Sequence, residues 1–323
     1  MYAAVLRAAG EVPAYAVHPD PEAGPGTTLI RVTAAPVVPL DLLCASGTSY
    51  FGSPAVPYVP GVQGVGIVER SATLPESARV WFATNAGMAP GDGSLAERCV
   101  VPDTDVVPLE SGAADPDMAA LGLSGVAAWM ALTWRARLQP GETVLVLGAG
   151  GAVGQSAVGA ARLLGAGRVV AVCRSAEAQE RARSAGADAV VPHTADVDAL
   201  AAGFAEASGG AVDVVVDPVF GVAATAASRV LAEGGRLVNL GGASGDVAEF
   251  SSAGLRSRSA SVLGYTNNAL TQLQRAAAVT AVAEHAAGGR MAVAHEVLPL
   301  AGAADAWRRQ ATGDAGVRLV LTP

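Results

Sequence analysis

The sequence contains no lysine, and each of its 21 basic residues is an arginine. This excludes a lysine Schiff base, a lysine general base and the Walker-type phosphate loop, which requires a lysine. Charged residues make up only 15% of the chain, and the formal net charge is −8. An acidic chain whose arginines are scattered argues against a nucleic-acid-binding protein.

Cysteine is also scarce, because Cys44, Cys99 and Cys173 lie far apart and form no CxxC pair. Three isolated cysteines in 323 residues argue against a disulfide framework and favour a reducing cytoplasm. No apolar run reaches the roughly 18 residues of a membrane span, and the first residues lack the basic-then-apolar order of a secretory signal. We therefore expect a cytoplasmic protein with neither a membrane nor a nucleic-acid partner.

The pattern of the chain changes near residue 118. Before this point, short β-type runs alternate with proline and glycine turns, which is typical of a barrel or sandwich. The change opens with an apolar helical stretch from Met118 to Trp134. Val- and Leu-rich strands then alternate with helices, which predicts a parallel sheet covered on both faces. The sequence therefore predicts an α/β protein of about two domains.

A glycine-rich turn, Gly148-Ala-Gly-Gly-Ala-Val-Gly154, follows the apolar strand Thr143–Leu147 and precedes an Ala-rich helix. Its spacing is GxxGxxG, because Val153 takes the last glycine position of the strict GxGxxG pattern. Glycines at such a turn let the backbone approach a pyrophosphate, and the helix N-terminus directs free N–H groups at it. We expect the phosphates of a dinucleotide at Gly150, Gly151, Ala152 and Val153, the alternative being an ordinary strand-to-helix turn.

The end of the second strand distinguishes NAD from NADP. An acidic residue about 20 positions after the turn would bind the ribose 2′-hydroxyl of NAD. Here that position is Arg174, followed by Ser175, and the first acid, Glu177, lies in the next helix. Because a guanidinium pairs with a phosphate, Arg174 favours NADPH, unless it is simply a solvated loop residue.

These motifs together resemble the medium-chain dehydrogenase/reductase superfamily. Val38-Pro-Leu-Asp41 is similar to its "NPxD" segment, and Tyr58 to Val68 is similar to its "PG-(H/S)-(E/D)-xxGxV" strand. Gly93 to Pro102 is similar to "GxxAEYVxVP", and Gly148 to Gly154 matches the nucleotide turn. The chain looks most like the zinc-free quinone oxidoreductase branch, which includes zeta-crystallin.

The resemblance implies a GroES-like β-barrel catalytic domain, residues 1–118 with 265–323, and a doubly wound Rossmann domain, residues 119–264. The active site would lie in the cleft between them, and many relatives form homodimers through the last Rossmann strand, here Ser261–Gly264. Zinc-dependent members carry Cys, His and Glu ligands where this chain has Val38, Pro39, Val62 and Gln63. These side chains do not suit zinc, so we expect no metal.

The resemblance also implies further contacts, each of which has a plainer alternative as a turn or surface residue. Tyr50 falls near a tyrosine that reaches nicotinamide or substrate, and His193 matches a histidine near the adenosine end. Gly241 and Gly242 follow the strand that passes the nicotinamide. Asn267 and Asn268 follow the last strand and are expected near the carboxamide. A lysine that often meets the 2′-phosphate is replaced by Ala178, which leaves Arg174 to carry that charge alone.

The function expected is NADPH-dependent, zinc-independent transfer of hydride to a small-molecule acceptor, a quinone or activated enone. A quinone accepts hydride readily and its oxygen is protonated by water, so no strong acid is needed, and Tyr50 is the best candidate to donate a proton to the acceptor or to orient it. One alternative is an enoyl or tailoring reductase of a biosynthetic pathway. The other is a non-enzymatic nucleotide-binding relative, since a fold does not fix a function.

Overall fold

A computed structural model describes residues 1–49 and 51–323. The chain divides into two compact units. The first comprises Met1–Gly122, Val279–Gly288 and Val293–Pro323, and the second comprises Leu123–Ala278 and Gly289–Ala292. Residues 265–278, expected in the first domain, therefore pack with the second unit.

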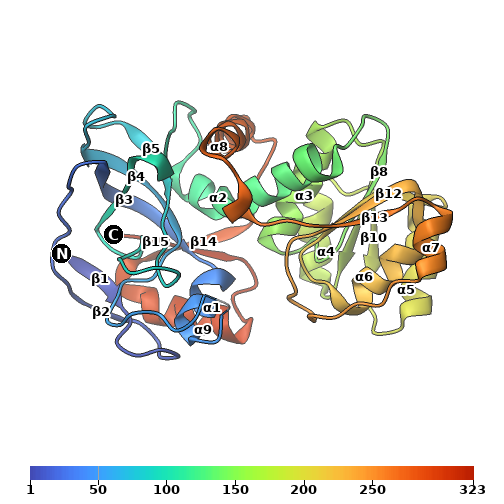
Figure 1. The fold of residues 1–323 in the computed structure, drawn as a ribbon, viewed down its shortest axis with the longest axis horizontal. Coiled ribbons are helices and arrows are strands. Elements are labelled where there is room, and N and C mark those ends of the chain that lie inside the picture. Colours follow the sequence, from blue (N-terminus) through green and yellow to red (C-terminus); the bar gives the residue numbers. More distant parts are fainter. Residues whose placement is uncertain (50) are drawn as a thin grey trace. The chain divides into compact units, whose positions relative to one another are not determined.

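The helices and strands follow one another in three stretches of the chain (Figure 1). The first stretch contains β1 (Tyr2–Val5), β2 (Ala14–Val17), β3 (Thr27–Val37), α1 (Pro39–Ser46), β4 (Gln63–Arg70), β5 (Arg79–Ala83), β6 (Arg98–Pro102), η1 (Asp103–Asp105), β7 (Val106–Pro108) and α2 (Asp115–Met130). The second contains η2 (Ala131–Ala136), β8 (Thr143–Val146), α3 (Ala152–Leu163), β9 (Arg168–Cys173), α4 (Ala176–Ser184), β10 (Ala189–Pro192), α5 (Val197–Ser208), β11 (Val212–Asp217), α6 (Gly221–Arg229), β12 (Leu231–Asn239), α7 (Ser252–Ser257), β13 (Ser261–Gly264) and η3 (Asn267–Ala269). The third contains α8 (Gln272–Ala287), β14 (His295–Pro299), η4 (Leu300–Gly302), α9 (Ala303–Thr312) and β15 (Arg318–Thr322).

The first unit is built around a seven-stranded sheet in the order β14-β15-β3-β4-β5-β7, with β6 also paired to β3. The long strand β3 pairs antiparallel with β4, β6 and β15, so it joins the N-terminal part of the unit to the C-terminal strands. Large apolar side chains such as Leu6, Ile30, Phe82 and Leu95 are fully buried in its core. This burial accounts for the many short apolar runs in the first part of the sequence.

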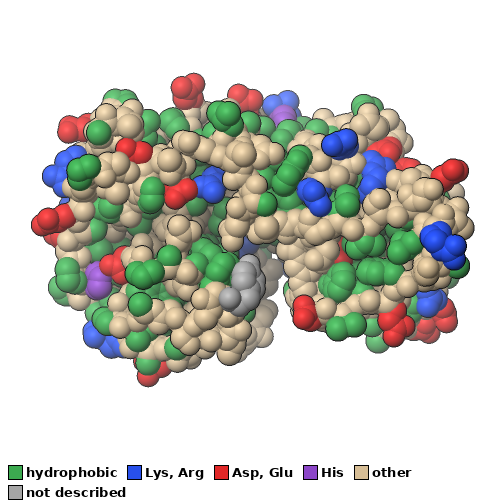
Figure 2. All heavy atoms as spheres, viewed as in Figure 1, with side chains coloured by type: hydrophobic (Ala, Val, Ile, Leu, Met, Phe, Trp, Pro, Cys, Tyr) green, Lys and Arg blue, Asp and Glu red, His purple; other side chains and the backbone are tan. Residues whose placement is uncertain are grey.

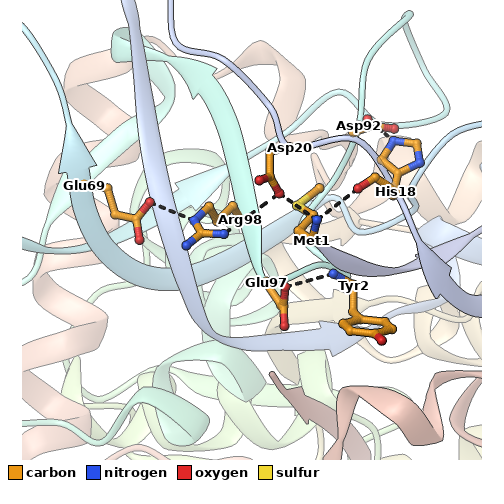
Figure 3. Close-up of polar contacts among 8 residues, drawn as sticks. All are labelled: Met1, Tyr2, His18, Asp20, Glu69, Asp92, Glu97 and Arg98. Atoms are coloured by element: carbon orange, nitrogen blue, oxygen red, sulfur yellow. Dashed lines mark hydrogen bonds and ion pairs between the residues drawn. The ribbon is translucent and has the colours of Figure 1, made fainter.

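Polar contacts fasten the β1–β2 hairpin to the rest of the first unit (Figure 3). The Tyr2 backbone N–H donates to Glu97 Oε2 at 2.8 Å, and His18 Nε2 lies 2.8 Å from Asp92 Oδ2. The other oxygen of Asp92 accepts the Val59 N–H at 2.8 Å. The loop that carries Asp92 is thus held against the segment that leads into β4.

The second unit contains a six-stranded, fully parallel sheet in the order β10-β9-β8-β11-β12-β13. This is the order of a doubly wound sheet, in which ligands bind outside the carboxyl ends of the strands. Helices α3 and α4 pack together, as do α5 and α6, on opposite faces (Figure 1). The predicted parallel sheet is confirmed, and the central strands are uniformly apolar because both of their faces are covered.

The helix expected from Met118 to Trp134 differs from the one observed. It begins at Asp115 and ends at Met130, and Gly122 interrupts it with φ 30° and ψ −129°. A Cβ atom at this position would lie 2.0 Å from Gln63 Oε1, so a buried side chain of β4 occupies the space. A π-helical turn, η2, then follows. Packing that the local sequence does not reveal therefore divides the predicted helix.

Surface features agree with the composition. On the face drawn in Figure 2, charged side chains of both signs are scattered and form no basic stripe. Among the described residues, no helix combines the length and hydrophobicity that crossing a bilayer would require.

Candidate functional site

The glycine turn lies between β8 and α3, at the carboxyl edge of the parallel sheet. Gly148 has φ 62°, in the left-handed region that favours glycine, and a Cβ there would lie 2.6 Å from Val219 Cγ1. A Cβ at Gly154 would lie 2.4 Å from the Gly148 carbonyl oxygen. These two glycines therefore fold the turn tightly onto its own helix.

The two glycines in the middle of the turn, Gly150 and Gly151, differ in how much space surrounds them. A Cβ at Gly150 would lie 2.3 Å from Ala178 Cβ on α4, whereas a Cβ at Gly151 would meet nothing closer than 3.5 Å. Gly151 is the N-cap of α3 and provides no side-chain cap for the first helical N–H groups. Uncapped N–H groups and the helix dipole make this end of α3 an anion site. The backbone at Gly151, Ala152 and Val153 thus fits the pyrophosphate of a dinucleotide.

The predicted adenosine-end residues follow the next two strands. Arg174 comes directly after β9, is exposed, and makes no hydrogen bond or ion pair with any described residue. Ser175 caps α4, because its Oγ accepts the Ala178 N–H at 3.2 Å. The His193 N–H donates to the Cys173 carbonyl at 2.8 Å, which places His193 just past β10. The structure therefore brings Arg174, Ser175 and His193 to the same sheet edge as the glycine turn.

The other half of this edge is shaped by a buried carboxylate. Asp217, at the end of β11, accepts N–H groups from Val219 at 3.0 Å and Phe220 at 2.7 Å. Burial raises the pKa of Asp217, and these hydrogen bonds oppose the rise. At the end of β12, the Asn239 side chain donates to the Gly241 carbonyl at 2.8 Å. The predicted Gly241 and its neighbour Gly242 are therefore positioned beside the β11 turn.

The two asparagines after β13 differ in how they are held. Tyr265 donates to Asn267 Oδ1 at 2.6 Å, and Asn267 Nδ2 donates to the Leu123 carbonyl at 3.2 Å. Both ends of this amide are therefore engaged within the second unit, so its expected contact with a carboxamide stays a prediction. Asn268 is exposed, and its N–H is bonded to Thr266 Oγ1 at 3.3 Å. The predicted Tyr50 lies outside the described residues.

A second polar centre, in the first unit, surrounds Asp41 of α1. This carboxylate is buried and accepts the N–H groups of Val38 at 2.8 Å and Val62 at 2.9 Å. Burial raises its pKa to about 7, against the lowering effect of these hydrogen bonds and of Arg318. Burial lowers the pKa of Arg318 to about 10, and Arg318 also donates to the Val37 carbonyl at 3.2 Å. Asp41 thus joins β3, α1, β15 and the segment before β4, and it braces this junction.

Two of the four positions at which the family resemblance implies zinc ligands in zinc-dependent members, Val38 and Val62, serve this bracing. Val38 and Val62 are buried and give their N–H groups to Asp41, while Gln63 accepts the Trp81 indole N–H at 3.3 Å. Within residues 1–49 and 51–323, no three His, Cys, Asp or Glu side chains gather so that a metal ion would fit. These residues do not suit zinc.

Sequence reasoning missed two residues that contact the turn. Gln155 Nε2 and Arg181 Nε donate to the Gly150 carbonyl at 2.9 and 3.1 Å. Arg181 lies three residues after Ala178, hence on the same face of α4. That spacing was the signal available in the sequence, but the contact depends on how closely α4 approaches the turn.

Two family descriptions match the chain. Residues 24–111 match "Alcohol dehydrogenase GroES-like domain", and residues 152–284 match "Zinc-binding dehydrogenase". The chain is 32% identical to bovine (Bos taurus) quinone oxidoreductase-like protein 2 over 69% of its length. It is 31% identical over 91% of its length to a phenolphthiocerol/phthiocerol polyketide synthase protein of Mycobacterium tuberculosis. These matches span 63% and 13% of those two proteins.

A solved structure matches along the whole chain. The quinone oxidoreductase from Thermus thermophilus, also solved as its complex with NADPH, is 30% identical, covers 100% of both chains and gives a TM-score of 0.80. The expected GroES-like and Rossmann-type parts are confirmed by the family matches. The chain belongs to the quinone oxidoreductase-like branch of the medium-chain dehydrogenase/reductase superfamily.

Proposed function

We propose that this protein is an NADPH-dependent oxidoreductase that reduces a quinone or activated enone without zinc. The observation that carries this proposal is the free space beside the Gly151 backbone, at the start of α3, where no side chain caps the first N–H groups. The bound NADPH would supply a hydride, which leaves the protein to bind and orient the two reactants and to exclude water. The NADPH complex of the Thermus thermophilus relative supports this choice of cofactor.

The preference for NADPH over NADH would depend on Arg174. Its guanidinium is exposed and has no partner among the described residues, and it follows β9 where the 2′-substituent of the adenosine ribose is recognised in this fold. A guanidinium binds a phosphate through charge-assisted, often paired hydrogen bonds. Ser175 and His193 lie at the same edge and would complete the adenosine end of the site.

The acceptor end requires little acid chemistry. Reduction of a quinone moves two electrons and one proton with the hydride, and the second proton can come from water. We propose that Tyr50 orients the acceptor, as the resemblance implies, so that Tyr50→Phe lowers kcat while NADPH binding is retained.

We also predict that two copies pair through β13, which forms one end of the second sheet, and that the protein is cytoplasmic.

The second candidate function is an enoyl reductase, and the match to a polyketide synthase protein favours it. The two candidates differ in acceptor, since an α,β-unsaturated thioester needs a positioned proton donor. Pro39 and Leu40 precede Asp41 where related enoyl reductases use tyrosine, and the chain has no lysine. We therefore rank this activity second.

A substrate panel distinguishes the candidates. NADPH oxidation would be followed with 1,4-benzoquinone, an enone and an enoyl thioester, and with no acceptor as the control. Faster turnover with the quinone or enone supports the proposal, whereas faster turnover with the thioester supports the enoyl reductase. Tight NADPH binding without turnover of any acceptor would contradict both and favour a nucleotide-binding relative that is not an enzyme.

A further inference from the structure

The carbonyl of Gly150 is held by two side chains from two different helices. Gln155, on α3, donates through Nε2 at 2.9 Å, and Arg181, on α4, donates through Nε at 3.1 Å. Within the described part of the chain, this is the one hydrogen bond that the Arg181 guanidinium makes. A charged donor strengthens such a bond, so the guanidinium is committed to the backbone of the turn.

The position of α4 makes this contact possible. A Cβ at Gly150 would lie 2.3 Å from Ala178 Cβ, so α4 packs directly against the turn. Cys173 Sγ also donates to the Ala178 carbonyl at 3.4 Å, which ties the start of α4 to the end of β9. Because position 178 is an alanine, the side chain of Arg181, one turn further along, reaches the Gly150 oxygen.

The orientation of this carbonyl matters for binding an anion. A peptide oxygen carries partial negative charge, so a Gly150 carbonyl turned toward the pyrophosphate would repel it. The adjacent Gly151 N–H is bonded back to the Gly148 carbonyl at 3.1 Å, which fixes the same peptide plane. The side-chain donors from α3 and α4 occupy the Gly150 oxygen and fix its orientation. Such preorganisation increases affinity because less ordering remains to be done on binding.

We infer that Arg181 is a positioning residue that fixes the Gly150 peptide for pyrophosphate binding. The inference rests on the proposed function, since it requires a dinucleotide at this turn. Arg181 would act on the binding of the pyrophosphate, which NADPH and NADH share. Loss of Arg181 is therefore expected to weaken both dinucleotides by the same factor, unlike loss of Arg174, which is expected to weaken NADPH alone.

Arg183 offers a matched control on the same helix. It carries the same charge two residues away, but its side chain is more than half exposed and lies 3.5 Å from Glu180. Removing Arg183 changes the net charge of α4 as much as removing Arg181 does. A difference between these two variants therefore reports the contact with Gly150 and not the loss of a positive charge.

The test measures dissociation constants for NADPH and NADH by nicotinamide fluorescence, with the melting temperature of each unliganded protein. The proteins are the wild type, Arg181→Ala, Arg181→Lys and Arg183→Ala. Arg181→Ala is expected to raise both constants about tenfold, which corresponds to about 1.4 kcal/mol. Arg181→Lys should restore part of the affinity, and Arg183→Ala should leave both constants unchanged.

Three results would overturn the inference. Unchanged constants with a lowered melting temperature would make Arg181 merely structural, and weakening of NADPH alone would make it a ligand of the 2′-phosphate. Equal weakening by Arg183→Ala would reduce the effect to net charge. If the wild type binds neither dinucleotide, the proposed function itself fails, and this result is distinct from binding that Arg181→Ala leaves intact.

Discussion

The two units each contain a strand that turns sharply into a helix, and they build these turns by different means. In the second unit, glycines let the chain pass from β8 into α3, and the first N–H groups of α3 receive no side-chain cap. In the first unit, the turn from β3 into α1 is organised by the buried Asp41, whose carboxylate accepts the Val38 N–H. The turn before α3 is thus left open to an external anion, whereas the turn before α1 contains a carboxylate of the protein itself.

This difference shows where function can be located. An open helix N-terminus attracts a phosphate from outside the chain, while the Asp41 carboxylate already accepts the backbone N–H groups of Val38 and Val62 from within the unit. Two kinds of substitution test this difference. One removes the buried charges of Asp41 and Arg318 in the first unit, and the other adds a side chain at the glycine turn of the second.

The largest effect is expected from Arg318→Met. It removes the buried positive charge that attracts Asp41, and a buried carboxylate left without such compensation costs about 3 kcal/mol or more. Urea unfolding at pH 8 should show this loss, and it should be smaller at pH 5.5 because Asp41, with its pKa of about 7, can then take up a proton. Arg309→Met, which breaks the Glu296 pair at the surface, is the control and should change little. Equal effects of the two substitutions would contradict the bracing role.

The next effect concerns pH. The pKa of Asp41 is about 7 in the folded protein and about 3.9 in an unfolded chain, so between these values only the folded state binds the proton. The stability contributed by this proton is complete below about pH 4 and is lost as the pH rises to about 7, by up to about 1.4 kcal/mol per pH unit. Asp41→Asn lacks this slope. The stability of the wild type relative to Asp41→Asn should therefore fall from pH 5 to 7 and level off by pH 8, and a difference independent of pH would refute the assignment.

A smaller effect is expected from filling the glycine turn at two positions. Gly154→Ala places a Cβ 2.4 Å from the Gly148 carbonyl oxygen, which should destabilise the protein by about 1–3 kcal/mol. The Cβ of Gly151→Ala would meet no atom closer than 3.5 Å, so the unliganded protein should melt normally. NADPH binding should nevertheless weaken in Gly151→Ala, because the methyl group enters the space left for the pyrophosphate. Normal NADPH binding by this variant would show that the phosphates lie elsewhere.

The smallest effect is expected at the cap of α4. Ser175→Ala removes the acceptor of the Ala178 N–H and should cost about 1 kcal/mol, whereas Ser175→Gly should cost only a few tenths. Thermal unfolding of the two variants measures this difference. If Ser175→Ala loses more free energy of NADPH binding than free energy of unfolding, Ser175 joins the residues that contact the adenosine ribose.

The features that the sequence predicts well are those encoded in one short segment. One stretch of the sequence contains the strand before Gly148, the glycines and the helix that begins at Ala152. Arg174 is likewise located by a local feature, because it directly follows β9. Each of these depends on local backbone geometry, for which glycine and apolar runs are direct signals.

The features that the sequence does not predict depend on contacts between distant segments. Arg318 approaches Asp41 only after β15 pairs with β3, and the kink at Gly122 depends on where Gln63 lies. The role of Arg181 similarly requires α4 to rest on Gly150. Composition and spacing carry no record of such approaches, because they arise from tertiary packing.

The central claim is that the second unit binds NADPH with its 2′-phosphate at Arg174. The most direct test is a paired equilibrium titration of the wild type and Arg174→Ala with NADPH and NADH, followed by nicotinamide fluorescence. The account predicts that the wild type binds NADPH more tightly than NADH by about tenfold or more, and that Arg174→Ala loses this preference while still binding NADH. Equal and weak binding of both dinucleotides by the wild type would contradict the account.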